Sequence, residues 1–196
     1  GWIQGTGYTG EAGVEIFVPN RDAPGLWSAL LGAGAPFGLV PVGLGARDTL
    51  RLEKGYLLSG QDFLWPGLGI EPDAALPDGF LSRDSAETAV PYGLDIEHDF
   101  VGRERVLASL ESGPRWDGLI CLERGPSPRP GHAVLSSEAE DAEPLGYVTS
   151  GGPSPSLERK GIAMAYLEGA EQGQEVWIQA SPRRRVRAQV CRPPFV

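Results

Sequence analysis

Residues that bind metals or form disulfides are scarce in this sequence. Its 196 residues include two cysteines and two histidines. Cys121 and Cys191 lie far apart without CxxC spacing, and His98 and His132 are equally isolated. A structural zinc site takes about four such ligands, and a disulfide framework needs several cysteine pairs. We therefore expect two reduced, buried thiols and no metal site.

Long hydrophobic runs and an excess of positive charge are also missing. No apolar run approaches the roughly 20 residues that a bilayer-spanning helix needs. The net charge of −9 and the pI near 4.7 disfavour sequence-independent binding to nucleic acid. The basic cluster Arg183–Arg185, with Arg187, lies between predicted strands, so we interpret it as a solvated hairpin turn. We expect a cytoplasmic protein with no membrane or nucleic-acid partner.

What the chain does contain is typical of a globular protein. A hydrophobic fraction of 41% and a charged fraction of 22% are ordinary values, and 196 residues can form one large domain or two small ones. The triplet Ser112-Gly113-Pro114 lies between a part with mixed helix and strand signals and a part with short strand signals. We therefore predict domains over 1–112 and 113–196. A Pro/Gly-rich stretch, Trp65–Gly79, is interpreted as an inserted surface loop.

The first part mixes strand and helix signals. Glu15–Val18 predicts a buried strand that ends at Pro19, and Tyr56–Leu58 predicts another short strand. Asp22 can cap a helix that ends at Gly32. The apolar face of that helix, which we expect in the core, consists of Leu26, Trp27, Leu30 and Leu31.

Two glycine-rich segments resemble a ligand site. The first, from Gly7 to Val18, reads GYTGEAGVEIFV, and its turn carries Tyr8 and Glu15 towards a strand. The second, from Gly43 to Gly55, reads GLGARDTLRLEKG, and a helix predicted over Ala46–Lys54 begins near Arg47. An arginine near a helix start opposes the helix dipole, which is a hint of function. A surface ion pair of Arg47 with Asp48 or Glu53 is the alternative, and a salt-bridged strand residue is the alternative for Glu15.

The second part of the chain predicts an all-β unit. After a helix predicted over Gly102–Leu110, which buries Val106, Leu107 and Leu110, short apolar runs alternate with Gly/Pro/Ser turns. This spacing indicates a small antiparallel barrel or sandwich. The runs are Leu119–Glu123, His132–Leu135, Leu145–Thr149, Gly161–Tyr166, Glu175–Gln179 and Val186–Cys191, and acidic Glu138–Glu143 is a hairpin tip.

Several long motifs then resemble one family, in order. GYTGEAGVEIFVP, GLGARDTLRLEKGYLLSGQD, HDFVGRE, GYVTSGGPSPSLERKGIAMAY and the terminal PPFV are similar to the second half of aminomethyltransferase, the T-protein of the glycine cleavage system. The resemblance implies an α+β chain, with the C-terminal part of a folate-binding α/β domain followed by a small antiparallel β-barrel domain. The family's chain is about twice as long. Because Gly1 is not an initiator Met, we expect an N-terminally truncated chain.

The resemblance also implies an activity in glycine catabolism and one-carbon metabolism. A T-protein accepts the aminomethyl group on the lipoyl arm of the H-protein, releases ammonia and passes the carbon to tetrahydrofolate. By motif match, Tyr8 would stack near the pterin and Glu15 would bind its aminopyrimidine edge. Arg47 would help hold the folate, and Tyr56 would line the pocket. The family's catalytic aspartate lies in its N-terminal half, so we assign no catalytic residue here.

Two other functions share these features. A related tetrahydrofolate-dependent demethylase would act on an N-methyl or S-methyl donor within the same folate framework. A non-enzymatic folate-binding relative would lack the catalytic aspartate in its full-length chain. The intact GYTGE, GARD and SGGPSPS motifs favour the aminomethyltransferase, and without the missing half we expect this chain to be inactive alone.

Overall fold

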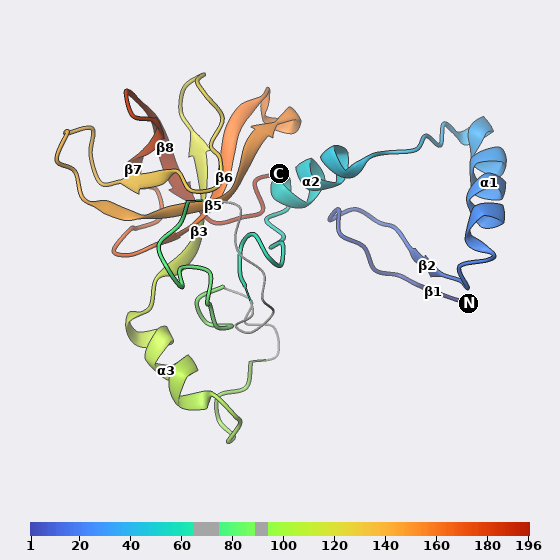
Figure 1. The fold of residues 1–196 in the computed structure, drawn as a ribbon, viewed down its shortest axis with the longest axis horizontal. Helices are drawn as coiled ribbons and strands as arrows, with labels where there is room; N and C mark the ends of the chain where they lie inside the picture. The colour runs from blue at the N-terminus through green and yellow to red at the C-terminus, as the bar shows by residue number, and fades with distance from the viewer. Residues whose placement is uncertain (65–74, 89–93) are drawn as a thin grey trace. The chain divides into compact units, whose positions relative to one another are not determined.

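The structure is a computed structural model that describes residues 1–64, 75–88 and 94–196. The chain divides into two compact units, Gly1–Arg51 and Leu52–Val196, and each is considered by itself. Helices and strands both occur, so the predicted α+β class is confirmed (Figure 1). The predicted loop at Trp65–Gly79 falls mostly outside the described residues. No helix within the described ranges combines the length and apolar character that a bilayer crossing requires.

The first unit begins with a two-stranded antiparallel sheet. Strand β1 (Trp2–Gln4) pairs with β2 (Glu15–Phe17), and the rings of Trp2 and Phe17 stack with centroids 5.0 Å apart. The predicted strand is therefore present, but the prediction that it is buried was wrong. Phe17 is 38% exposed because no further layer of this unit packs on the sheet.

Helix α1 (Ala23–Gly34) follows, and a short 3-10 helix, η1 (Ala35–Phe37), extends it. Asp22 occupies the N-cap position, but its side chain makes no capping hydrogen bond. The helix also continues past Gly32, because a glycine only weakens a helix unless it adopts the left-handed conformation, as Gly38 does after η1. The predicted core face was wrong as well: α1 buries no residue, and Trp27 is 54% exposed.

Helix α2 (Leu44–Glu53) agrees with the predicted helix in the GLGARD segment. Gly55 follows it with φ +73°, the left-handed conformation that ends many helices. The predicted strand at Tyr56–Leu58 was wrong. These residues lead instead into a turn in which the carboxylate of Asp62 accepts a hydrogen bond from the Leu58 amide at 2.8 Å. A carboxylate that caps a turn in this way replaces the ladder bonds of a strand.

The second unit contains a closed antiparallel barrel, which confirms the predicted barrel domain (Figure 1). Its strand order is β3-β6-β5-β4-β7-β8, and β8 pairs with β3 to close it. All six predicted runs are strands: β3 (Arg115–Cys121), β4 (Ala133–Leu135), β5 (Pro144–Ser154), β6 (Lys160–Leu167), β7 (Glu175–Ser181) and β8 (Arg184–Cys191). Pro182 and Arg183 form the β7–β8 turn, but Arg184, Arg185 and Arg187, which were predicted in that turn, lie in β8.

Alternation along the strands separates two apolar clusters. Ala163, Ala165 and Leu167 of β6 belong to the main barrel core, with valines and other residues of the remaining strands. Ile162 and Met164, which point to the opposite face of β6, pack instead with Leu52, Phe195 and the short helix η2 (Pro155–Leu157). The barrel is therefore covered on part of its outer surface.

Within the second unit, the buried carboxylate of Glu53 is held by the end of β5 and by η2. Glu53, 5% exposed, accepts hydrogen bonds from the Ser154 hydroxyl, from the Ser156 amide at 3.0 Å and from the Ser156 hydroxyl at 2.9 Å. Burial alone would raise the pKa of Glu53, but these hydrogen bonds outweigh it and lower the pKa. Two serines of the SGGPSPS motif, Ser154 and Ser156, thus bind the Glu53 carboxylate.

Helix α3 (Arg103–Ser112) lies before the barrel. Val106 is buried as predicted, but Leu107 is only half-buried and Leu110 is 36% exposed, because the helix contacts its surroundings along a narrower stripe. The Ser109 hydroxyl donates to Asp84 at 2.5 Å, and Arg105 lies 3.4 Å from the same carboxylate. These polar contacts hold α3 against the turn at residues 83–88.

Candidate functional site

The predicted site residues of the first unit come from its hairpin and from α2. The Arg47 guanidinium carbon lies 4.5 Å from the centroid of the Tyr8 ring, which is a cation–π contact. Tyr8 sits in the glycine-rich turn, where Gly10 adopts φ +77°. Arg47 sits in the first turn of α2, so the structure brings the GYTGE and GARD segments together at this contact.

Glu15 lies at the start of β2, and its carboxylate is held by the neighbouring strand. The Thr6 hydroxyl and the Gln4 side-chain amide, the latter at 3.4 Å, both donate to Oε2. Gln4 is the direct partner of Glu15 in the β1–β2 register. These hydrogen bonds, chiefly that from Thr6, lower the pKa of Glu15. The carboxylate is therefore an anion at neutral pH, and among described residues no donor reaches its Oε1.

The alternative interpretation of Arg47 as half of a surface ion pair can be compared with the geometry. Asp48 pairs with Arg51, its Oδ1 lying 2.7 Å from Nε and 2.6 Å from one terminal nitrogen. Glu53 accepts its hydrogen bonds from Ser154 and Ser156. Within the described ranges, no carboxylate lies within ion-pair distance of Arg47. The alternative ion pair of Arg47 with Asp48 or Glu53 is therefore not formed among the described residues.

Tyr56, the fourth predicted site residue, belongs to the second unit. It is 39% exposed and lies three residues beyond Glu53, where α2 ends. Its predicted role in lining a folate pocket therefore stays a prediction. Both cysteines are free thiols, but only Cys121 is buried as predicted, and Cys191 is half-buried. Burial raises the pKa of each to about 11.

Sequence reasoning missed the two residues that position Glu15. Thr6 and Gln4 both precede the glycine-rich turn, in a stretch that reads as a plain strand end. Pairing β1 with β2 about the turn would have placed Gln4 opposite Glu15, since cross-strand neighbours on one face interact directly. The residue pairing of the hairpin, and not a motif, could therefore have identified Gln4 as a partner of Glu15.

Two family models match the chain. One, the GCVT N-terminal domain, covers residues 1–64, and the other, the glycine cleavage T-protein C-terminal barrel domain, covers 118–196. The chain is 43% identical over 195 residues to an aminomethyltransferase of Frankia alni, covering 97% of this chain and 47% of that protein. It is 39% identical over 196 residues to one of Moorella thermoacetica, covering 98% and 48%.

A solved structure agrees with these matches. The glycine cleavage system aminomethyltransferase T from Bartonella henselae aligns with a TM-score of 0.75 at 32% identity, over 99% of this chain and 49% of that one. The closed barrel and the preceding helices thus define an aminomethyltransferase-type α+β fold. The chain belongs to the glycine cleavage T-protein family, which confirms the resemblance of its motifs. It spans about half the length of the curated relatives it matches.

Proposed function

We propose that this chain is part of a tetrahydrofolate-dependent aminomethyltransferase of the glycine cleavage system. The observation that carries the proposal is the Tyr8–Arg47 contact, which joins a flat aromatic face to a cation within one unit. The family membership and the names of the matched relatives support the same activity. They also favour it over a demethylase or a non-enzymatic folate-binding protein.

The side chains suit the parts of a reduced folate. Glu15, an anion whose Oε1 has no described donor, can accept hydrogen bonds from the aminopyrimidine edge of the pterin in charge-assisted geometry. Tyr8 offers an apolar face for the ring, and Arg47 offers donors for the carboxylates of the glutamyl tail. Thr6 and Gln4 fix the orientation of Glu15, so that the acceptor is in place before the ligand binds.

In the proposed reaction these residues bind and orient the substrate. The aminomethyl carbon, carried on a lipoyl sulfur of the H-protein, loses its bonds to sulfur and to ammonia and gains two bonds to folate nitrogens. The products are methylenetetrahydrofolate, ammonia and the reduced lipoyl arm, with no net oxidation. Correct placement of the folate nitrogen against the carbon is the larger part of such catalysis. Lipoylated H-protein is the proposed protein partner.

Titration calorimetry of the full-length protein with tetrahydrofolate tests this assignment. We expect Glu15→Ala and Arg47→Ala each to weaken binding at least about tenfold, since a hydrogen bond to a charged group contributes about 1.5–3 kcal/mol. Asp22→Asn and Arg21→Ala are matched controls, because both residues lie on the surface of the same unit and, among the described residues, their side chains pair only with each other, at 3.7 Å. Unchanged affinity in both site variants, with intact folding, would refute the site.

The remaining expectations extend the same proposal. We infer a cytoplasmic location from the composition, and a functional division of the chain at 112/113. Separate expression of residues 113–196 tests the division: a cooperative unfolding transition supports it, and an unfolded product refutes it. Fractionation of cells that produce the protein tests the location.

A further inference from the structure

The PPFV segment, residues 193–196, lies within the second unit against the residues that end α2 and follow it. The Phe195 amide donates a hydrogen bond to the carbonyl oxygen of Glu53 at 2.8 Å. The Lys54 ammonium donates to a backbone oxygen of Val196 at 3.3 Å. Two consecutive residues of the PPFV segment thus bind two consecutive residues that lie far away in the sequence.

The Phe195 side chain anchors the PPFV segment to the barrel. It is 9% exposed and belongs to the apolar cluster that contains Leu52, Ile162 and Met164. A Cβ at Gly118 of β3 would lie 2.8 Å from the phenylalanine ring, so the ring occupies the space that this glycine leaves. Because burial of an aromatic ring removes a large apolar surface from water, Phe195 stabilises the segment in this position.

Pro193 contacts the residues after α2 at Gly55. A Cβ at Gly55 would overlap the Pro193 ring and would lie 3.3 Å from the Trp116 indole, so a side chain is excluded there. Gly55 also has φ +73°, a conformation that glycine adopts at no steric cost. The backbone at Gly55 is therefore enclosed by Pro193 and Trp116, and it can shift only if one of them shifts.

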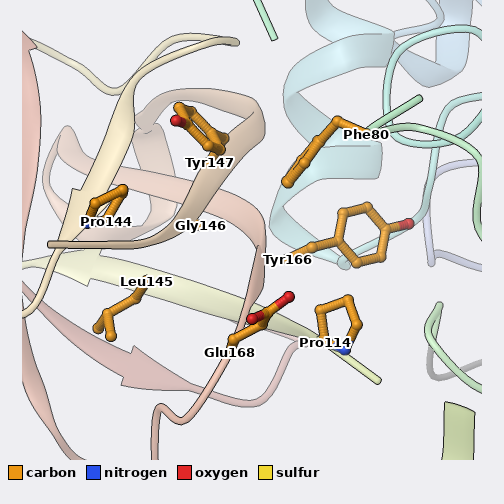
Figure 2. A pocket seen from close by; sticks show the side chains of 8 residues that line it. All are labelled: Phe80, Pro114, Pro144, Leu145, Gly146, Tyr147, Tyr166 and Glu168. Atoms are coloured by element: carbon orange, nitrogen blue, oxygen red, sulfur yellow. The ribbon is translucent and has the colours of Figure 1, made fainter. Parts of the chain in front are cut away.

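Trp116 is supported by neighbouring packed rings. It is the cross-strand partner of Tyr166 in the β3–β6 register, and such partners extend from the same face of a sheet. Tyr166 is 1% exposed, and Figure 2 shows the Phe80 ring beside it. The two rings meet at 75° with centroids 6.1 Å apart. Since these rings are packed edge to face, Trp116 is held in place beside Gly55.

The far end of the same stretch is also fixed to the barrel. The fully buried Asp62 accepts hydrogen bonds from the Leu58 amide at 2.8 Å and from the Thr149 hydroxyl at 2.5 Å. Gln61 donates to the Ser150 hydroxyl at 2.7 Å. Thr149 lies where the register of β5 with β6 shifts, and such irregularities are common beside functional sites. Residues 53–62 are therefore held at both ends.

Tyr56 is the exposed aromatic residue of this fixed stretch. It is 39% exposed, whereas Gly55 before it and Leu57 after it are half-buried. A side chain on a backbone that is already fixed loses less conformational freedom when a ligand covers it, which lowers the entropic cost of binding.

We propose that the PPFV segment is a positioning element of the folate site: it holds Gly55 in place and thereby presets the position of Tyr56. Pro193 and Phe195 are its positioning residues, and they act through Gly55 and Tyr56 without touching the substrate. The inference rests on the proposed folate-dependent function, in which Tyr56 lines the pocket.

A double-mutant cycle between Phe195 and Tyr56, measured by calorimetry of the full-length protein with tetrahydrofolate, tests the proposal. We expect Phe195→Ala and Tyr56→Leu each to weaken binding about three- to tenfold, the effect of one side chain that is no longer preset. Phe195→Leu keeps most of the apolar contact and should stay within about twofold of the parent. In the Phe195→Ala protein, Tyr56→Leu should cause little further loss, because residues that act together are not additive. Losses that multiply in the double variant would overturn the proposal.

Ile178→Ala is the matched control for a general loss of stability. Ile178 is also buried, but it lies on β7 in the main barrel core and not in the cluster that contains Phe195. It should destabilise the protein comparably and leave the folate affinity unchanged. Equal losses of affinity in Ile178→Ala and Phe195→Ala would overturn the proposal.

A second variant, Pro193→Gly, removes the ring from Gly55 and leaves the Phe195 anchor in place. It should weaken folate binding in the same direction, and it tests the proposal where Phe195→Ala does not fold. Parent affinity in Pro193→Gly and in a folded Phe195→Ala would refute the role of the PPFV segment alone. A parent protein that does not bind tetrahydrofolate would refute the proposed function itself.

Discussion

The guanidinium of Arg47 lies over the ring of Tyr8, 4.5 Å from its centroid, and so ties the hairpin turn to helix α2. If this pair holds folate, the ring matters more than its hydroxyl. We expect Tyr8→Leu to weaken tetrahydrofolate binding about three- to tenfold in calorimetry of the full-length protein, because a cation–π contact contributes about 1 kcal/mol. Tyr8→Phe should stay close to the parent. Equal losses in the two variants would assign the effect to the hydroxyl.

Thr6 is expected to set the ionisation of Glu15. In Thr6→Val the main hydrogen bond to the carboxylate disappears, so the lowered pKa of Glu15 should rise towards its ordinary value of 4.5. Nuclear magnetic resonance titration of the Glu15 carboxyl carbon measures this. Thr9→Val is the control, since the Thr9 hydroxyl instead accepts a hydrogen bond from the Glu11 amide at 3.2 Å. The same pKa in parent and Thr6→Val would show that Thr6 does not act on Glu15.

The pH dependence of the proposed folate binding follows from the same shift. Because its pKa is lowered, Glu15 stays ionised from pH 8 down past pH 6. The Glu15 contribution to affinity should therefore be constant over that interval and disappear only as the pH falls through the lowered pKa. Comparing parent and Glu15→Gln across this series isolates the contribution. A difference between them that changes between pH 6 and 8 would contradict the assignment.

Glu53 should contribute measurably to stability. We expect Glu53→Gln to lower the free energy of unfolding by about 2 kcal/mol, since a buried carboxylate with three donors is replaced. Because the folded-state pKa is lowered, the stabilisation is present at neutral pH and is lost as the pH falls through that pKa. Urea unfolding at pH 7 and pH 4 measures this. The exposed Glu140→Gln should change little, and a loss for Glu53→Gln that is independent of pH would contradict the charge argument.

Both thiols should react slowly in the folded protein. Burial, the main cause, raises the pKa of Cys121 and Cys191 from 9.0 to about 11, so at pH 8 the thiolate fraction falls about one hundredfold. Labelling with a chromogenic disulfide reagent should therefore be slow before unfolding and should yield two thiols per chain in denaturant. Rapid labelling of either cysteine in the folded protein would contradict this expectation.

The strands were more predictable from sequence than their surroundings. Strands β7 and β8 alternate buried and more exposed residues, so the predicted runs Glu175–Gln179 and Val186–Cys191 could be recognised from local residues. The strand order and the closure through β3 could not, because they depend on pairings between distant segments. The face of α1 shows the same limit: periodicity identified Trp27 and Leu30 as one apolar face, but it cannot say whether anything covers that face.

The candidate site was also predictable only in part: its residues could be selected from the sequence, but their contacts could not. The family resemblance selected Tyr8, Glu15 and Arg47, but only coordinates show that Arg47 meets Tyr8 while Asp48 pairs with Arg51. A charged residue on a helix can pair with the residue three or four positions away, and the side-chain positions determine which pair forms. The ring contacts of Phe80 with Tyr147 and Tyr166 left no linear signal, because the tyrosines meet through strand register and Phe80 lies far from both in the sequence.

The pairing of β3 with β8 has a consequence for how the barrel is made in the cell. Strand β3 is synthesised first among the barrel strands, yet one of its two neighbours is the last. Until the ribosome has released β8, the edge of β3 keeps unpaired amides and carbonyls that can join a strand of another chain. The nascent protein is therefore most prone to mispairing just before its last strand emerges, and shielding by a chaperone would matter most at that stage.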